Sequence, residues 1–140
     1  MEFLGIPLDE AEMSDEVKEY LRETGGLTWG DVSDAIKSEM ESRLNEDYRV
    51  NPMQFAKMVN AYHFFEEISK AHGGYVDPIK IEPKQMHVGI TAYCLLFDFY
   101  GDYMKRFADI MSDCLSLSID SLTNGMVCFS FLIPDVFVHK

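Results

Sequence analysis

Basic side chains are scarce in this sequence. Its 140 residues include 12 lysines and arginines against 24 aspartates and glutamates, a formal net charge of −12. Lys105 and Arg106 form the one adjacent basic pair. Direct binding of DNA, RNA or an anionic lipid surface requires a basic patch that neutralises phosphates. The composition therefore predicts no direct binding of nucleic acid and favours a basic partner.

Long apolar runs are also lacking. A membrane-spanning helix needs about 20 consecutive, mostly apolar residues. The longest candidate, Val88 to Tyr100, is interrupted by Gly89, Thr91 and Asp98. The first residues show no basic segment ahead of an apolar one, so they lack the pattern of a secretory signal peptide. We expect a soluble protein with no membrane partner and a cytoplasmic location.

Cysteine and histidine are few and scattered. The three cysteines, Cys94, Cys114 and Cys128, form no CxxC pair, which favours small core residues in a reducing compartment. The four histidines form no HExxH motif and no cluster with cysteine. A GxSxG turn and a glycine-rich phosphate loop are also missing. The sequence therefore predicts no catalytic residue, no metal ligand and no cofactor.

The chain has, in contrast, ample material for a core. Hydrophobic residues make up 47% of it, and 10 phenylalanines and 7 tyrosines supply bulky side chains. A chain of this length buries roughly two thirds of its unfolded surface, so we expect one domain over residues 1–140. Its first eight residues are predicted to be an irregular lead-in, because Gly5 and Pro7 interrupt regular structure.

Two amphipathic helices are predicted in the first third of the chain. The first runs from Asp9 or Ser14 to Glu23, where apolar residues recur at helical spacing and two glycines follow. The second begins at Thr28, a favourable N-cap, and its apolar stripe starts with Trp29. We therefore place the Trp29 side chain in the core.

A third helix has the clearest pattern. Asn51 is a strong N-cap and Pro52 suits the first helical position. Apolar residues then recur every three or four positions until Gly73-Gly74, which predicts about 20 helical residues.

Beyond Gly74 the apolar period changes from 3.6 to 2. Residues 79–81 predict a short edge strand limited by prolines on both sides. Residues 87–99 predict a long strand that is apolar on both faces in its second half, and therefore central in its sheet. A fourth helix is predicted to follow Gly101.

The C-terminal segment alternates between apolar and polar residues. Leu115 to Asp120 predicts a strand with one wet face, and Asn124-Gly125 is a strong signal for a hairpin turn. The returning strand should bury one apolar face, with Pro134 at its end; that face comprises Val127, Phe129, Phe131 and Ile133.

These elements define an α+β fold in which three N-terminal helices precede a β-α-β-β unit with a small, mainly antiparallel sheet. Within the single domain, residues 1–75 form a helical, acidic part and residues 76–140 form a sheet-containing part. The strand order does not follow from the sequence.

Acidic residues are concentrated at the front of the chain. Residues 1–50 hold 14 acidic and 5 basic side chains. One interpretation is a solvated face that maintains solubility. The other is a docking surface on which helix-spaced carboxylates imitate a phosphate backbone and occupy the groove of a nucleic-acid-binding protein. The candidate partner-binding residues are Glu12, Asp15, Glu16, Glu19 and Glu23.

The leading hypothesis is therefore a non-enzymatic protein-interaction module, a regulator or inhibitor that binds a basic protein. Two alternatives stay open: a small enzyme with dispersed site residues around His87, Tyr93 and Asp98, and a structural subunit of a larger assembly. An apolar edge strand near the C-terminus would permit a sheet-extending homodimer. In size and acidity the chain resembles small accessory proteins of bacteria and phages, a likeness that no motif carries.

Overall fold

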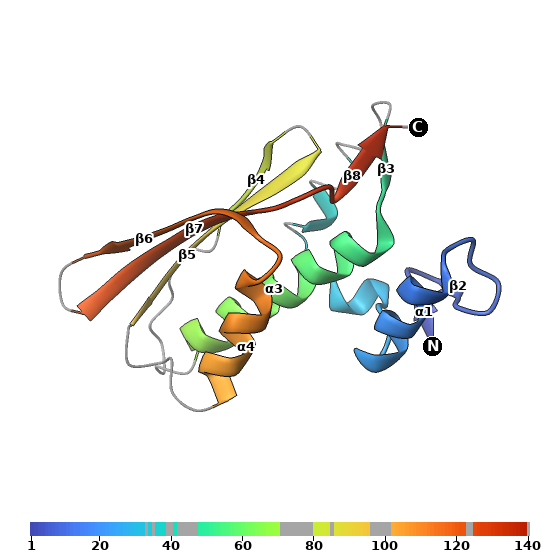
Figure 1. Cartoon of the computed structure of the whole chain (residues 1–140), viewed down its shortest axis with the longest axis horizontal. Helices are drawn as coiled ribbons and strands as arrows, with labels where there is room; N and C mark the ends of the chain where they lie inside the picture. Colours follow the sequence, from blue (N-terminus) through green and yellow to red (C-terminus); the bar gives the residue numbers. More distant parts are fainter. Residues whose placement is uncertain are drawn as a thin grey trace.

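The computed structural model describes residues 1–32, 34, 36–38, 41, 48–70, 80–84, 86–95, 102–122 and 125–139. Within this part the protein has four helices and eight strands in three sheets, so its class is α+β. The prediction of three N-terminal helices is wrong, because strands are interspersed with the helices from the first residues onward (Figure 1).

The first eight residues form a β-hairpin where an irregular lead-in was predicted. Strand β1 (Glu2–Phe3) pairs antiparallel with β2 (Ile6–Pro7). Leu4 and Gly5 join them with φ angles of 48° and 87°. Two successive residues with positive φ are what a tight two-residue hairpin needs, so Gly5 makes the turn instead of ending regular structure.

Helix α1 (Asp15–Glu23) agrees with the later of the two predicted starts. The Ser14 hydroxyl accepts a hydrogen bond from the Val17 N–H and caps the helix. At the other end Gly25 and Gly26 have φ angles of 87° and 80°, and the Gly26 N–H donates to the Leu21 carbonyl. The glycines thus end the helix as their lack of Cβ allows.

The second predicted helix does not begin as one continuous helix at Thr28. A short 3-10 helix, η1 (Trp29–Asp31), forms there, and the Thr28 N–H donates to the Asp31 carboxylate at 2.9 Å. Val32 then takes an extended conformation, and residues 34, 36–38 and 41 are helical again. Trp29 is 43% exposed and lies beside Gly5, so its predicted burial is wrong.

Helix α3 (Pro52–Lys70) is the central element of the fold and confirms the predicted start at Pro52. Immediately before it, β3 (Tyr48–Val50) pairs antiparallel with β8 (Phe137–His139), a strand that the sequence pattern did not reveal. The Asn51 N–H donates to the Val136 carbonyl, and the Gln54 amide donates to the Pro134 carbonyl. The start of α3 is therefore attached to the end of the chain.

The main sheet has four antiparallel strands in the order β4-β5-β7-β6. Strand β5 lies inside it, as predicted, and residues 96–99 of the predicted strand are outside the described part. The edge strand β4 continues through Pro83, which an edge tolerates because it need not donate a ladder hydrogen bond there. The strands are β4 (Lys80–Lys84), β5 (His87–Leu95), β6 (Leu115–Ser121) and β7 (Met126–Ile133).

The core lies between one face of this sheet and the helices (Figure 1). Alternate residues of β5 and the predicted apolar face of β7 are buried, and they meet buried side chains of α3. Helix α4 (Asp102–Met111), the predicted fourth helix, packs the apolar side chains of Tyr103, Phe107, Ile110 and Met111 on the same core. Phe65 of α3 has its ring centroid 5.7 Å from those of both Phe129 and Phe131.

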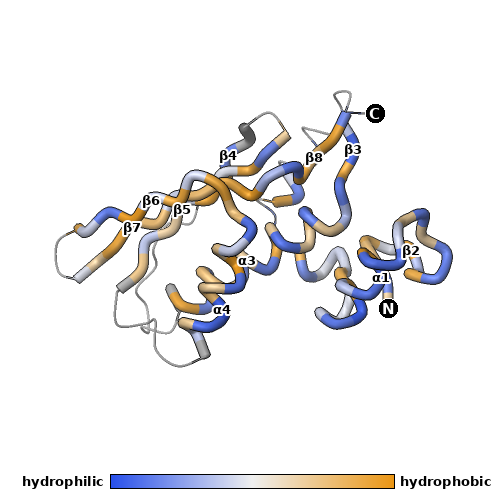
Figure 2. The backbone as a smooth tube through the Cα atoms, viewed as in Figure 1, coloured by the Kyte–Doolittle hydropathy of each residue, from blue (hydrophilic) through white to orange (hydrophobic). Residues whose placement is uncertain are grey.

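Strand β6 is exposed along its whole length. Leu115, Leu117 and Ile119 are 46%, 42% and 52% exposed, and Figure 2 shows apolar residues continuing to this end of the sheet. A register shift between Leu115 and Ser118, with Ser116 at φ 55°, marks a β-bulge in the strand. None of the helices in the described part of the chain has the length and hydropathy to cross a lipid bilayer.

Candidate functional site: an acidic helix face beside a polar pocket

The predicted partner-binding carboxylates are all exposed, and they lie close together in the chain. Glu12 lies just ahead of α1, and the other four belong to the helix. At 3.6 residues per turn, positions 15, 16, 19 and 23 fall within about 100° of the helix circumference. We call these five residues the acidic face: Glu12, Asp15, Glu16, Glu19 and Glu23.

Most of these carboxylates form no ion pair within the part of the chain that the structure describes. Arg22 contacts the carboxylates of Glu19 at 3.8 Å and Asp9 at 3.6 Å. The other four members of the acidic face form no ion pair with any residue that the structure describes. Exposed pairs such as those of Arg22 are weak. The face thus presents a strong negative potential to the solvent.

Helix stability explains only part of this pattern. Asp15 and Glu16 occupy the first turn, where the partial positive charge of the helix dipole stabilises carboxylates. Glu23 occupies the last turn, where the same dipole disfavours a negative charge by roughly 0.3–1 kcal/mol. Its position is therefore a small cost to the helix, and capping of α1 does not account for it.

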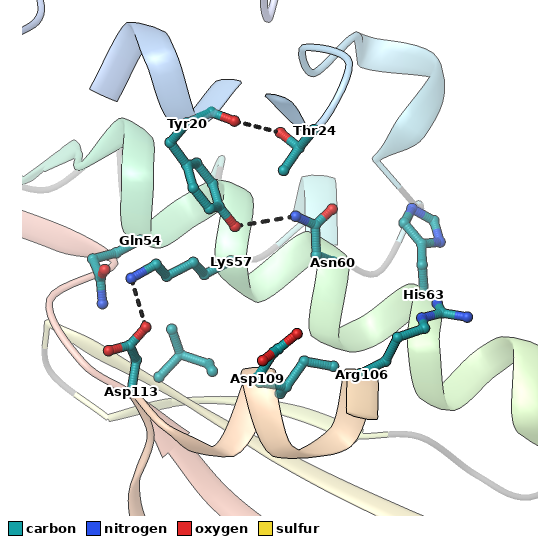
Figure 3. A pocket seen from close by; sticks show the side chains of 11 residues that line it. Tyr20, Thr24, Gln54, Lys57, Asn60, His63, Arg106, Asp109 and Asp113 are labelled. Carbon is teal, nitrogen blue, oxygen red and sulfur yellow. Dashed lines mark hydrogen bonds and ion pairs between the residues drawn. The ribbon is translucent and has the colours of Figure 1, made fainter. Parts of the chain in front are cut away.

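Beside the acidic face is a pocket of about 530 Å³. Helices α1, α3 and α4 supply nearly all of its lining, and Ile133 of β7 completes it. Figure 3 shows polar side chains from the three helices around one opening. The polar residues of the helices are Tyr20, Gln54, Lys57, Asn60, His63, Arg106 and Asp109; Thr24 follows α1, Asp113 follows α4, and Ile110 is a further apolar contact.

The α1 wall of the pocket joins it to the acidic face. The Tyr20 hydroxyl and the Asn60 side-chain amide form a hydrogen bond of 3.3 Å between α1 and α3. Glu16 and Glu23 stand four residues before and three residues after Tyr20, so they are its neighbours on the helix surface. The α1 wall of the pocket therefore lies next to these two carboxylates on the helix surface.

Two ion pairs connect α3 with the segment of α4. The Lys57 ammonium lies 2.8 Å from the Asp113 carboxylate, and Arg106 lies 3.0 Å from Glu67. The Arg106 guanidinium also covers the Phe64 ring at 5.0 Å from its centroid. Asp109, between these pairs on α4, forms no ion pair with the described residues.

The pocket histidine has a structural contact. A ring nitrogen of His63, Nε2, lies in hydrogen-bond contact with the backbone carbonyl of Asp31, to which it donates. The other ring nitrogen is 3.8 Å from the Glu66 carboxylate. This arrangement attaches η1 to α3 and fixes the imidazole ring with its proton on Nε2.

The residues of the enzyme hypothesis are not assembled in one place. His87 and Tyr93 stand six positions apart on β5, about 20 Å along an extended strand. His87 accepts a hydrogen bond from the Asp135 N–H instead. Asp98 lies outside the described residues.

The cysteines and the acidic clusters form no metal centre within the described part of the chain. Burial raises the pKa of the Cys114 thiol, the opposite of what a nucleophilic cysteine requires. Cys94 is fully buried, as predicted for a core residue. Among the described residues no three histidine, cysteine or acidic side chains are close enough to hold a metal ion.

Sequence reasoning did not find the pocket. The sequence feature that could have indicated the pocket is a polar stripe at three-residue steps on α3, which consists of Gln54, Lys57, Asn60 and His63. That stripe resembles an ordinary solvated helix face until α1 and α4 are seen on either side of it. Comparison with family models, with curated proteins and with solved structures found no match to this chain.

Proposed function

We propose that this protein is a non-enzymatic binding module that docks on a basic protein through its acidic face. The observation that carries the proposal is the set of exposed carboxylates on one side of α1 and just ahead of it, four of which form no ion pair with the described residues. With a net charge of −12, the protein attracts a positively charged partner over long range and repels polyanions.

The proposed partner class is a protein with a phosphate-binding surface. Carboxylates four residues apart on a helix are separated by about 6 Å along its axis and are held rigidly. A row of lysines and arginines that normally contacts a nucleic-acid backbone would find negative charge along this helix. Binding there would inhibit or regulate the partner, and the module itself would bind no nucleic acid.

A charge-neutral variant of the acidic face tests this proposal. In E12Q/D15N/E16Q/E23Q the four carboxylates without ion pairs become amides of similar shape. We expect this variant to capture far less of the native basic partner from a cell lysate than the original protein does. The affinity of the purified complex should fall at least about tenfold between about 50 and 300 mM salt.

A matched variant separates the face from the overall charge. Glu10, Asp34, Glu41 and Asp120 are exposed acids outside the acidic face. Neutralising these four changes the net charge equally and should leave affinity almost unchanged. Equal losses in the two variants, or an affinity that is flat with salt, would reject the docking surface in favour of a merely solubilising role.

The exposed edge of the sheet supports a second partner, another copy of the chain. Strand β6 presents apolar side chains and is an edge of the main sheet among the described residues, and its one charge is Asp120. An antiparallel pairing about a two-fold axis at Ile119 would place Asp120 opposite Ser118, so the acidic copies would avoid direct repulsion there. The bulge at Ser116 would limit this pairing to the second half of the strand.

A further inference from the structure

We infer that Trp29 and Ile6 form an apolar anchor at the N-terminal hairpin, and that this anchor binds an arginine side chain of the basic partner. We call these two residues the hairpin anchor. The inference rests on the proposed function, because the partner that it specifies is the one that the acidic face attracts. Trp29 is the single tryptophan of the chain and belongs to η1.

The turn between β1 and β2 brings the two side chains of the hairpin anchor to one place. Ile6 directly follows Gly5, the second residue of this turn. A Cβ built on Gly5 would lie 3.6 Å from Nε1 and 3.9 Å from Cδ1 of Trp29. The five-membered ring of the indole therefore lies against the turn, at the position where Ile6 begins β2.

Hydrogen bonds hold the segment around Trp29 in place. The Leu27 N–H donates to the Glu2 carbonyl at 2.9 Å, and the Leu27 carbonyl accepts from the Leu4 N–H at 2.8 Å. On the other side of Trp29, the backbone carbonyl of Asp31 accepts a hydrogen bond from the His63 ring of α3. Binding would therefore cost little conformational entropy at the anchor.

Both side chains of the hairpin anchor are open to solvent. Trp29 is 43% exposed and Ile6 is 51% exposed. The indole N–H of Trp29 forms no hydrogen bond with any residue that the structure describes. A single exposed apolar residue is ordinary. An aliphatic side chain beside a rigid, half-exposed indole is instead typical of the residues that contribute most to binding at protein interfaces.

The charge around the hairpin anchor favours a cationic partner. Residues 1–36 contain ten acidic side chains, and their only basic residues are Lys18 and Arg22. Asp31 belongs to the same short helix as Trp29, and Asp34 follows it. Neither carboxylate forms an ion pair with the described residues. A second copy of the chain would bring the same carboxylates together, so repulsion disfavours self-association here.

Arginine combines the properties that this surface requires. Its guanidinium is attracted to the face of an indole, the aromatic ring that binds cations best, and also pairs with carboxylates through two parallel hydrogen bonds. Its aliphatic stem can cover an apolar residue such as Ile6. The ammonium of lysine is a compact, strongly hydrated charge that stacks less well. The anchor should therefore prefer arginine to lysine, whereas the acidic face attracts both.

The emission of Trp29 provides a direct test, because no other tryptophan contributes to it. The full chain is titrated with hexa-arginine amide and with hexa-lysine amide, which carry equal charge. We expect a saturable change of emission with hexa-arginine and a Kd at least about threefold lower than that of hexa-lysine. Dye-labelled peptides measured by fluorescence anisotropy extend the comparison to variants without tryptophan.

Three variants assign the arginine preference to the anchor. W29L keeps an apolar side chain but removes the ring, so its preference should fall to within about 1.5-fold. W29F keeps a smaller aromatic ring and should retain part of the preference. I6S should weaken hexa-arginine binding about twofold or more, whereas M104S should leave it unchanged. Met104 is a matched control, since it is 50% exposed and lies on α4, away from the hairpin (Figure 1).

Three results would overturn the inference. Equal affinities of the two peptides for the original protein would show that no arginine site exists. A preference that survives in W29L, with its fold verified by circular dichroism, would place the site elsewhere. Bound hexa-arginine that leaves the emission of Trp29 unchanged would do the same without any substitution.

The anchor and the docking proposal can fail separately. The E12Q/D15N/E16Q/E23Q variant should bind both peptides more weakly but keep the preference for arginine, because the hairpin anchor is unchanged. An arginine preference without any basic partner in the cell would reject the docking proposal alone. A salt-sensitive basic partner whose affinity is the same for W29L, together with equal binding of the two peptides, would reject the anchor alone.

Discussion

Lys57 on α3 and Asp113, just beyond the end of α4, form an ion pair of 2.8 Å although 56 residues separate them in the chain. The Lys57 side chain is 24% exposed and that of Asp113 is 55% exposed. This pair forms one wall of the pocket and joins the helical layer to the segment that leads into β6.

The D113N variant should lose less than about 1 kcal/mol of unfolding free energy, because solvent screens a pair with an exposed partner. The loss should shrink further in about 1 M salt. Urea denaturation at low and high salt measures both effects, with the exposed Glu10→Gln as the control. A loss well above 2 kcal/mol, insensitive to salt, would show that the contact is not a screened surface pair.

Replacement of Phe65 by alanine should be far more destabilising. Phe65 is fully buried between the sheet and the helices, and it contacts Phe129 and Phe131. Removal of such a ring leaves a cavity and typically costs 3–5 kcal/mol. Guanidinium or urea denaturation provides the measurement, and Phe65→Leu, which fills more of the space, should cost less. Equal stability of the two variants would contradict the described packing.

The two glycines after α1 should respond differently to alanine. Both have positive φ, but a Cβ at Gly26 would lie 3.0 Å from the backbone oxygen of Glu2, whereas a Cβ at Gly25 would meet nothing within 4 Å. G25A should therefore cost on the order of 1 kcal/mol through backbone strain alone, and G26A clearly more. Thermal unfolding of the two variants measures which one loses more stability. A larger loss for G25A than for G26A would show that β1 does not lie against Gly26.

The edge of the sheet provides the test of self-association. Ile119→Lys places a charge on β6 and should lower the extent of dimer formation, measured by sedimentation over a range of concentrations. Ile6→Lys is a close control, because Ile6 is 51% exposed and Ile119 is 52% exposed. A monomer at all concentrations, or an equal effect of the two changes, would remove β6 as the dimer edge.

Much of the sheet and the central helix could be predicted from the sequence. The apolar faces of α3, β5 and β7 are set by side-chain periodicity, which a local stretch of chain carries by itself. The start of α3 follows from Pro52, and Ser14 was one of the two predicted starts of α1, since each residue acts within one helical turn. Predicting these elements therefore required no information about the elements that pack against them.

The N-terminal hairpin and the exposure of Trp29 were not predictable in this way. Gly5 is compatible with both a break and a tight turn, and its strand pairing decides between them. Likewise β3 is only three residues long, and it is a strand because β8, nearly 90 positions away, pairs with it. A short segment carries too little periodicity to reveal such a partner.

The sequence alone determined the excess of carboxylates at the front of the chain and the periodic apolar faces that build the core, because both depend on the order of residues. Only the tertiary structure decided which carboxylates stay without a cation and that Tyr20, Lys57 and Asp109 surround one pocket. Those features depend on how three helices, far apart in the chain, pack against one another.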